Sequence, residues 1–245
     1  MNLLNLRQLT PSRQEQLETL VRLCRDYEGI RLSCPLDADC FYLLEDKEGR
    51  LASALCIYED MDLPECRAFT LPSCRRQGYF RQLLDQFESE LGEGQMVFAA
   101  DPKGGDGLKT LEAIGASLWY EEYAMALELS GRPAPKGSLR PLRLRISRDP
   151  EDQELLSVLA EDGIPVGSCR LALSGSSCCL FSFEIRPGRR GGGLGYSFLQ
   201  KLLARLSLEG ISSMTLQVSG QNHAALSLYK KTGFRIRDTL SYYLY

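Results

Sequence analysis

The sequence predicts an α/β protein made of two related halves, and three observations support this. The 245 residues are 44% hydrophobic and 25% charged, as in ordinary globular proteins. The same order of strand-like and helix-like segments occurs twice along the chain. A stretch rich in proline and glycine, residues 131–141, separates the two copies. We therefore expect one domain over residues 1–130, a linker over 131–141 and a second domain over 142–245.

The repeat rests on landmarks that follow one another at similar intervals. Each half has a turn between two apolar runs, a strand-like run that leads into Pro-x-x-Arg, and an amphipathic helical pattern. The turn glycine precedes the arginine by 26 residues in the first half and 27 in the second, Gly49 to Arg75 and Gly163 to Arg190. Each half then ends with a strand, a helix that stops near a glycine, and a final strand rich in aromatic residues.

The halves differ at their beginnings. The first half has an additional helical pattern over about residues 11–27, whereas the second half passes almost directly from the linker to strands. The second half is therefore a truncated copy, and we expect the first domain to cover its missing front.

The composition argues against several classes of protein. The formal net charge is -3, which disfavours binding to nucleic-acid phosphates. We see no apolar run that could span a bilayer and no signal peptide, so we expect a cytoplasmic protein without membrane contact. The nine cysteines are odd in number and form no C-x-x-C pair, which favours reduced thiols. With one histidine, His223, a metal site is not expected.

A glycine loop between Ile185 and Gly195 carries the chemistry. A strand ends at a proline, and small residues then lead into a helix. Glycines let a ligand approach the main-chain N–H groups, and the N-terminus of a helix favours an anion. Arg189 and Arg190 add positive charge. The loop therefore predicts a pyrophosphate site.

The spacing of the glycines distinguishes between the classes of ligand that contain a pyrophosphate. The dinucleotide pattern G-x-G-x-x-G fails because Tyr196 and Phe198 stand where glycine is required, and the ATP-binding pattern G-x-x-x-x-G-K-[ST] is absent. The pattern that fits is Arg-x-x-Gly-x-Gly, from Arg190 through Gly193 to Gly195.

This loop resembles the coenzyme A loop of the GNAT acyltransferase superfamily. A second motif of that family is similar to the segment from Asn222 through Ala225 and Leu228-Tyr229 to Gly233-Phe234. The resemblance covers about residues 158–245. It implies two tandem GNAT-like domains, the first degenerate, each with a mixed, mostly antiparallel sheet that splays into a V and is flanked by helices.

The resemblance also implies the ligand and the residues that bind it. Acetyl-CoA would lie between the splayed strands, residues 181–185 and 213–218, and a primary amine would attack its thioester directly. The cofactor-binding residues would be Ile185, Arg186, Arg190, Gly191, Gly192, Gly193, Leu194, Gly195 and Asn222.

Two side chains are candidates for proton transfer. Tyr229 occupies the position at which family members carry a tyrosine that protonates the leaving thiolate, and a buried aromatic without a role is the alternative interpretation. Glu184, the carboxylate nearest the splay, is a candidate base, and a solvated strand residue is its alternative. Asn222 is expected to cap the following helix, and His223 to lie at the surface.

The first half is expected to be a decayed copy. It keeps Arg75 and Gly78, but Phe80 stands where a small residue would admit phosphates and Leu111 stands in place of Tyr229. We expect Phe80 to crowd a pyrophosphate and this half to shape the acceptor site.

Other functions stay open at this point. Both halves could be non-catalytic folds that bind CoA or a partner, and transfer of an aminoacyl group from tRNA is a third interpretation, which the acidic balance disfavours. The acceptor, a small-molecule or peptide amine, is not specified by any pattern, and neither is a homodimer.

Overall fold

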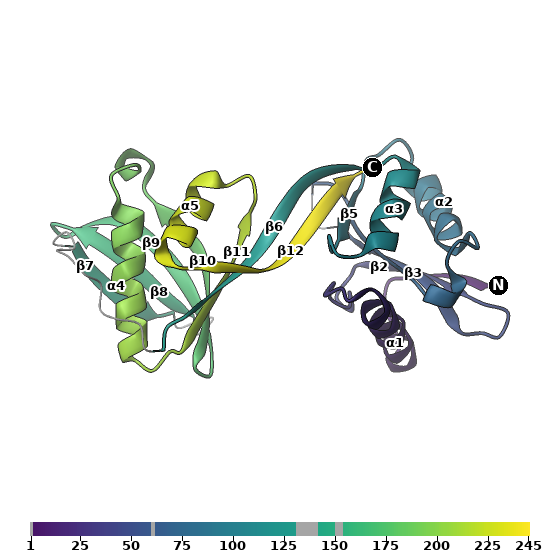
Figure 1. Ribbon diagram of the computed structural model, residues 1–245, viewed down its shortest axis with the longest axis horizontal. Helices are drawn as coiled ribbons and strands as arrows, with labels where there is room; N and C mark the ends of the chain where they lie inside the picture. Colours follow the sequence, from purple (N-terminus) through teal and green to yellow (C-terminus); the bar gives the residue numbers. More distant parts are fainter. Residues whose placement is uncertain (1, 60–61, 131–141, 150–153) are drawn as a thin grey trace. The chain divides into compact units, whose positions relative to one another are not determined.

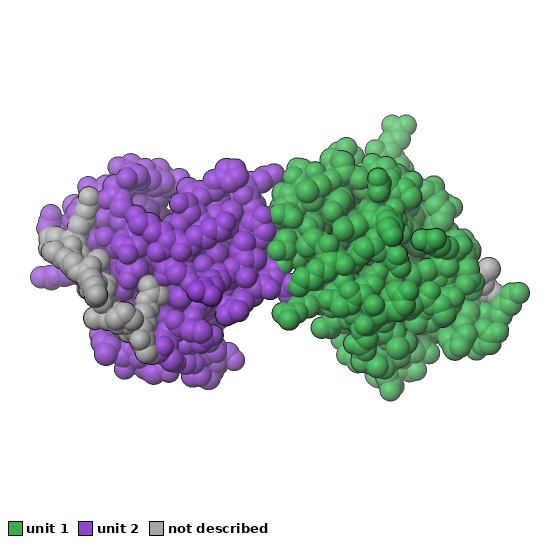
Figure 2. Space-filling model, viewed as in Figure 1, with its two compact units in different colours: residues 1–121, 239–245 green, residues 122–238 purple. Residues whose placement is uncertain are grey.

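The computed structural model describes residues 2–59, 62–130, 142–149 and 154–245, and the chain forms two compact units (Figures 1 and 2). Unit 1 consists of residues 1–121 and 239–245, and unit 2 of residues 122–238. The expected linker, residues 131–141, lies outside the described residues.

Unit 1 contains a sheet in the order β1-β2-β3-β4-β5-β12, in which β12 (Arg235–Leu244) is the last strand of the chain. Its neighbouring strands are antiparallel except β4 and β5, which are parallel. The elements of this unit are β1 (Asn2–Leu6), α1 (Pro11–Glu28), β2 (Cys40–Glu45), β3 (Leu51–Tyr58), β4 (Glu65–Thr70), the short 3-10 helix η1 (Pro72–Cys74), α2 (Tyr79–Leu91), β5 (Val97–Ala100) and α3 (Gly105–Ile114).

Helices bury both faces of this sheet, which explains why β2 and β3 are apolar almost throughout. Side chains of α1 pack with Phe41 and Leu43 on one face. Side chains of α2 and α3 pack with Tyr42 and Leu44, which alternate with them, on the other face. The helical pattern expected over residues 11–27 is confirmed as α1, and Thr10 caps its first turn.

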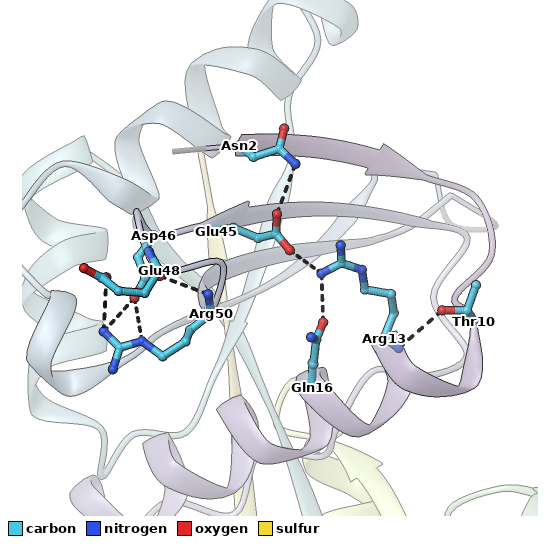
Figure 3. A network of polar contacts seen from close by, with 8 residues as sticks. All are labelled: Asn2, Thr10, Arg13, Gln16, Glu45, Asp46, Glu48 and Arg50. Atoms are coloured by element: carbon cyan, nitrogen blue, oxygen red, sulfur yellow. Dashed lines mark hydrogen bonds and ion pairs between the residues drawn. The ribbon is translucent and has the colours of Figure 1, made fainter.

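A polar network fastens α1 and β1 to the end of β2 (Figure 3). Glu45 accepts hydrogen bonds from Arg13, at 2.5 Å, and from Asn2, at 3.0 Å. The hydrogen bond from Arg13 is the main reason why the pKa of Glu45 is lowered. Next to it, Asp46 closes the β2–β3 turn by accepting from the main chain and side chain of Arg50.

Unit 2 contains a sheet in the order β6-β11-β10-β9-β8-β7, in which only β10 and β11 are parallel neighbours. Its helices α4 and α5 pack on one face, where one continuous core lies. On the opposite face β11 exposes Thr215 and Gln217, so the truncated half presents a polar surface there. The elements are β6 (Ser117–Glu128), β7 (Leu142–Arg148), β8 (Leu155–Glu161), β9 (Ile164–Ser174), β10 (Ser177–Ile185), the 3-10 helix η2 (Pro187–Arg189), α4 (Leu194–Leu208), β11 (Ser213–Ser219) and α5 (His223–Thr232).

The two strands that close the halves of the sequence are exchanged between the units. Strand β6 pairs with β11 of unit 2 over residues 122–128, and β12 pairs with β5 of unit 1 over residues 241–244. The compact units therefore differ from the contiguous domains that the repeat led us to expect. The apolar contacts explain the pairings: Met125 of β6 belongs to the core of unit 2, whereas Tyr242 of β12 packs with Val97 and Ala99 of unit 1.

Both units have a V-shaped opening in the sheet. Strands β4 and β5 pair only over Glu65 and Cys66, and β10 and β11 pair over residues 177–180 before they separate. Together with the flanking helices, this confirms the predicted fold class.

Two further expectations can be compared with the structure. None of the helices in the described part of the chain is long and apolar enough to cross a membrane. All nine cysteines are free thiols; seven are buried, Cys34 is half-buried and Cys179 is exposed.

Candidate active site

The end of β10 is bent by a β-bulge. The register with β9 shifts between Phe181 and Glu184, and Ser182 has a left-handed backbone with φ of 48°. The bulge lies directly after Leu180, the last β10 residue that pairs with β11. It therefore marks the point at which the V of unit 2 opens.

Beyond the bulge, the main chain of Ile185 faces the opening. The Arg186 N–H donates to the Val166 carbonyl at 3.0 Å, so these two residues form a hydrogen-bonded pair of the antiparallel ladder. The neighbouring pair, Ile185 and Gly167, then directs its N–H and C=O groups away from each other. The Ile185 carbonyl accepts from Arg190 Nε at 2.8 Å, which leaves the Ile185 N–H for a ligand.

Gly167 permits this close pairing. A Cβ at residue 167 would lie 2.6 Å from Ile185 Cδ1 and 2.8 Å from the Glu184 carbonyl oxygen. Only glycine fits at this distance from the backbone of β10. The sequence analysis did not single out Gly167, although an isolated glycine within an apolar strand is a signal of such an approach.

The glycine loop presents a row of main-chain donors. Gly191 and Gly193 have φ of 80° and 79°, and Gly193 is the N-cap of α4 without a side-chain cap. The first hydrogen bond of the helix runs from the Ser197 N–H to the Gly193 carbonyl. Within the described structure, the N–H groups of residues 191–196 have no protein acceptor, as is usual for the first turn of a helix.

Arg190 differs from the expectation in one detail. It was expected to bind the cofactor, but its main-chain N–H is not free for this: it donates to the Pro187 carbonyl at 3.3 Å because η2 closes a 3-10 turn there. The series of free donors therefore begins at Gly191, and Arg190 is left to act through its exposed guanidinium.

The charge beside these donors is positive. Arg186, Arg189 and Arg190 are exposed at the loop, and Arg189 forms an ion pair with Glu161. In the described part of the chain Arg186 and Arg190 make no ion pair. Two uncompensated guanidinium groups beside free N–H groups at a helix N-terminus suit an anion with more than one charge.

Helix α5 brings the second motif to the same opening. Asn222 caps it by accepting from the Ala225 N–H at 3.1 Å, which confirms the expected capping role. His223 is exposed at its first turn. Farther along, Leu228 lies over Gly195 of α4, at 3.0 Å from the position that a Cβ would take there.

Tyr229 lies in the core of unit 2 with only 7% of its surface exposed. Its ring contacts Phe183 and Phe234 edge to face, with centroids 6.3 and 5.7 Å away. Phe183 lies within the bulge, so the bulge positions a side chain that contacts the ring of Tyr229. Burial raises the pKa of Tyr229 to about 12, which keeps its hydroxyl protonated at neutral pH.

The hydroxyl of Tyr229 makes no hydrogen bond with the described residues. Among those residues, Ser157 Oγ is the only fully buried side-chain N or O atom without a partner, so the tip of Tyr229 reaches solvent. The side chain thus combines a fixed ring with a free proton donor.

Glu184 is exposed, and its carboxylate accepts from Ser168 Oγ at 3.1 Å. This contact holds it on the β9 side of β10, and it makes no contact with Tyr229 or the loop within the described structure. The geometry therefore unites Tyr229, the glycine loop and Ile185, and leaves Glu184 at the edge. In the described part of the chain no cluster of His, Cys, Asp and Glu is suited to a metal ion.

Comparison with known proteins identifies the family to which the segment around this site is similar. The model described as "Acetyltransferase (GNAT) family" matches residues 118–234, from β6 to the end of the second motif. Residues 118–234 therefore form a GNAT domain. The matched GNAT segment includes every residue of the candidate site, so the motifs that carried the resemblance lie within it.

Solved structures that resemble the chain support the fold over its whole length. A GCN5-related N-acetyltransferase from Sphaerobacter thermophilus superposes with a TM-score of 0.75 at 15% identity, covering 99% of this chain and 95% of that one. A tandem GNAT protein from the clavulanic acid biosynthesis pathway gives 0.69 at 13% identity, covering 100% and 98%. In sequence, the mycothiol acetyltransferase of Streptomyces avermitilis is 38% identical over 60 residues, which is 24% of this chain and 20% of that protein.

Proposed function

We propose that unit 2 is an acetyl-CoA-dependent N-acetyltransferase that acetylates a primary amine. The neutral amine attacks the thioester carbonyl, the new C–N bond forms, and the C–S bond breaks. Tyr229 donates its proton to the departing thiolate, and the proton released by the amine passes to solvent or to Glu184. The acceptor is a small-molecule or peptide amine.

One juxtaposition carries this proposal. The free N–H groups of residues 191–196, the Ile185 N–H and the Tyr229 side chain lie around the same opening in the sheet. The loop amides and Arg190 suit the diphosphate, and the Ile185 N–H suits an amide carbonyl of the pantetheine arm. Tyr229 supplies a proton at the inner end of the opening.

Unit 1 does not offer the same chemistry. It contains a cavity of about 490 Å³ at the corresponding opening, but Leu111 takes the place of Tyr229 and carries no proton. We therefore assign the reaction to unit 2 on the chemistry of its groups.

The experiment is a thioester-consumption assay with acetyl-CoA and a panel of primary amines, together with calorimetry of acetyl-CoA binding. Gly193→Val is expected to abolish binding, because a side chain at this left-handed position intrudes among the loop donors. Gly78→Val is the matched control, since Gly78 is the left-handed N-cap of α2 with φ of 81°. Unchanged affinity in Gly193→Val, or an equal loss in Gly78→Val, would refute the loop assignment.

The main alternative is a non-catalytic fold that binds CoA without turning it over. The position of Tyr229 argues against it, because the protein fixes the ring by edge-to-face contacts and leaves the hydroxyl without a partner among the described residues, as a proton donor requires. Binding of acetyl-CoA without consumption of the thioester by any amine would favour this alternative.

A further inference from the structure

The cavity of unit 1 is a separate feature of the molecule. It has a volume of about 490 Å³ and lies at the opening between β4 and β5, bordered by α1, the start of α2 and α3. Its size falls in the usual range of small-molecule sites. Most of its lining is apolar, including Ile30, Leu32, Phe69, Phe80, Phe98 and Ile114.

The loop beside this cavity has kept the backbone of the glycine loop in unit 2. Gly78 and Gly193 have φ of 81° and 79°, and Arg76 adopts a φ of 59° where Gly191 has 80°. Arg75 Nε donates to the Thr70 carbonyl at the end of β4, as Arg190 Nε does at the end of β10. A left-handed arginine is strained, so its presence shows that the loop shape is imposed by the surrounding fold.

The charges at the two loops differ. The Arg75 guanidinium donates to Glu28 at 2.6 Å and to Asp106 at 2.9 Å. Burial opposes the charge on Arg75, but these two carboxylates outweigh it and raise its pKa. Arg190 has no such carboxylates. A diphosphate beside Arg75 would meet two negative charges that are absent from unit 2.

The packing at this position also differs from the expectation that Phe80 crowds a pyrophosphate. Its counterpart, Gly195, directs its Cβ position toward Leu228, Ile185 and Phe183, away from the phosphate turn. Phe80 accordingly packs edge to face on Phe98 with centroids 6.0 Å apart. It forms an apolar wall of the cavity, so the disfavoured group in unit 1 is the diphosphate, for the electrostatic reason above.

The basic groups left without partners suggest what the cavity accepts. Arg76 and Lys109 are exposed, line the cavity, and make no ion pair within the described part of the chain. The acids are engaged: Glu28 and Asp106 by Arg75, and Asp101 by the N–H groups of Arg31 and Lys103.

The overall charge of the lining agrees with this. Among the basic side chains of the lining, Arg75 and Arg81 are held in ion pairs, Arg81 with Asp85 and Glu88, so the unpaired positive charges are those of Arg76 and Lys109. The start of α2 adds free N–H groups without a side-chain cap.

We propose that unit 1 binds a small carboxylic acid with an apolar body, distinct from the acetyl-CoA assigned to unit 2. The apolar part fills the cavity against Phe80 and Phe98, and the single carboxylate meets Arg76 and Lys109 at the mouth. A medium-chain or aromatic carboxylate matches both the volume of the cavity and the unpaired positive charges at its mouth.

Calorimetry on the full chain with octanoate, and with octanamide as the uncharged ligand of similar shape, tests the proposal. We expect one equivalent of octanoate to bind about tenfold more tightly than octanamide, because only octanoate brings a negative charge to Arg76 and Lys109. The double variant Arg76→Asn, Lys109→Gln should lower the affinity for octanoate to that for octanamide and leave octanamide unchanged. Asparagine tolerates the left-handed backbone at residue 76.

Two controls separate this site from unit 2. Gly193→Val should leave octanoate binding unchanged, and Ala113→Trp, on the exposed side of α3 at the cavity, should abolish it with the fold intact by circular dichroism. Equal affinities for octanoate and octanamide, no binding of octanoate, or displacement of octanoate by acetyl-CoA in the Gly193→Val variant would each overturn the proposal. Failure of unit 2 to consume acetyl-CoA would leave these results unaffected.

Discussion

Gly195 on α4 and Leu228 on α5 fit together so closely that a Cβ on Gly195 would lie 3.0 Å from Leu228 Cδ2. In unit 1 the residue that corresponds to Gly195 is Phe80, two residues after the N-cap glycine of the helix. The residue that corresponds to Leu228 is Thr110, counted back from the glycine that ends α3 or α5, and both line the cavity there. The larger side chain of the pair is Leu228 on α5 in unit 2 and Phe80 on α2 in unit 1. Each unit therefore has one large and one small side chain at this pair of positions, on opposite helices.

The first prediction follows from that exchange. Gly195→Phe should destabilise the chain by about 1–3 kcal/mol through overpacking against Leu228. Adding Leu228→Thr, which copies the pair of unit 1, should recover at least half of the loss. Urea unfolding of both variants measures the coupling. A double variant no more stable than Gly195→Phe alone would contradict the equivalence of the two pairs.

A second prediction concerns Gly167 on β9. Gly167→Ala places a methyl group 2.8 Å from the Glu184 carbonyl oxygen, and backbone cannot yield as a flexible side chain does. We expect a loss of about 1–3 kcal/mol and weaker binding of acetyl-CoA, because the end of β10 must shift. Gly188→Ala is the control, since a Cβ there meets nothing within 4 Å. It should change stability by less than about 0.5 kcal/mol.

Much of the fold could be predicted from local sequence patterns, whereas the pairing of the closing strands could not. The repeat, the order of strands and helices, the glycine loop and the cap at Asn222 follow from local patterns, which depend on period and turn chemistry. The exchange of β6 and β12 does not, because both closing strands are rich in aromatic residues and either could complete either sheet. The pairing depends on contacts between residues that are far apart in the sequence, such as Tyr120 and Tyr242, whose rings stack with centroids 4.5 Å apart.

The direction in which a side chain points could likewise not be predicted from the sequence. Phe80 could be aligned with Gly195, but whether that position faces the phosphate turn or the partner helix depends on how α4 and α5 pack. The bulge at Ser182 was also unpredicted, since serine has no special tendency to adopt a left-handed backbone.

A third prediction concerns the proton donor. Tyr229→Phe should lower kcat by about 10²-fold or more while the affinity for acetyl-CoA changes little, as expected for a general acid. Tyr242→Phe, a second buried tyrosine that lies outside unit 2, is the control. Equal turnover of Tyr229→Phe and the parent enzyme would exclude the acid role.

The pKa of Tyr229 adds a test by pH. With a pKa of about 12, its hydroxyl stays protonated, so kcat should rise as the amine loses its proton and show no alkaline decline from this residue below about pH 11. The folded pKa lies above the ordinary value of 10, so the associated stability is complete below pH 10 and is lost as the pH rises toward 12. Tyr229→Phe should remove that part of the decline in thermal stability.

The last prediction concerns the ion pairs of Arg75. Glu28 has 8% and Asp106 40% of its side chain exposed, whereas Arg75 has 19% exposed. Removing the buried carboxylate with Glu28→Gln leaves the half-buried Arg75 charge poorly compensated, and we expect a loss of about 1–3 kcal/mol. Asp106→Asn should cost less than about 1 kcal/mol, because water screens this pair. Chemical unfolding ranks the two, and Arg190→Gln in unit 2, which breaks no ion pair in the described structure, should fall within about 0.5 kcal/mol of the parent chain. If Asp106→Asn proves the more damaging of the two, burial does not govern this network, and the contrast drawn between the loops of the two units loses its electrostatic basis.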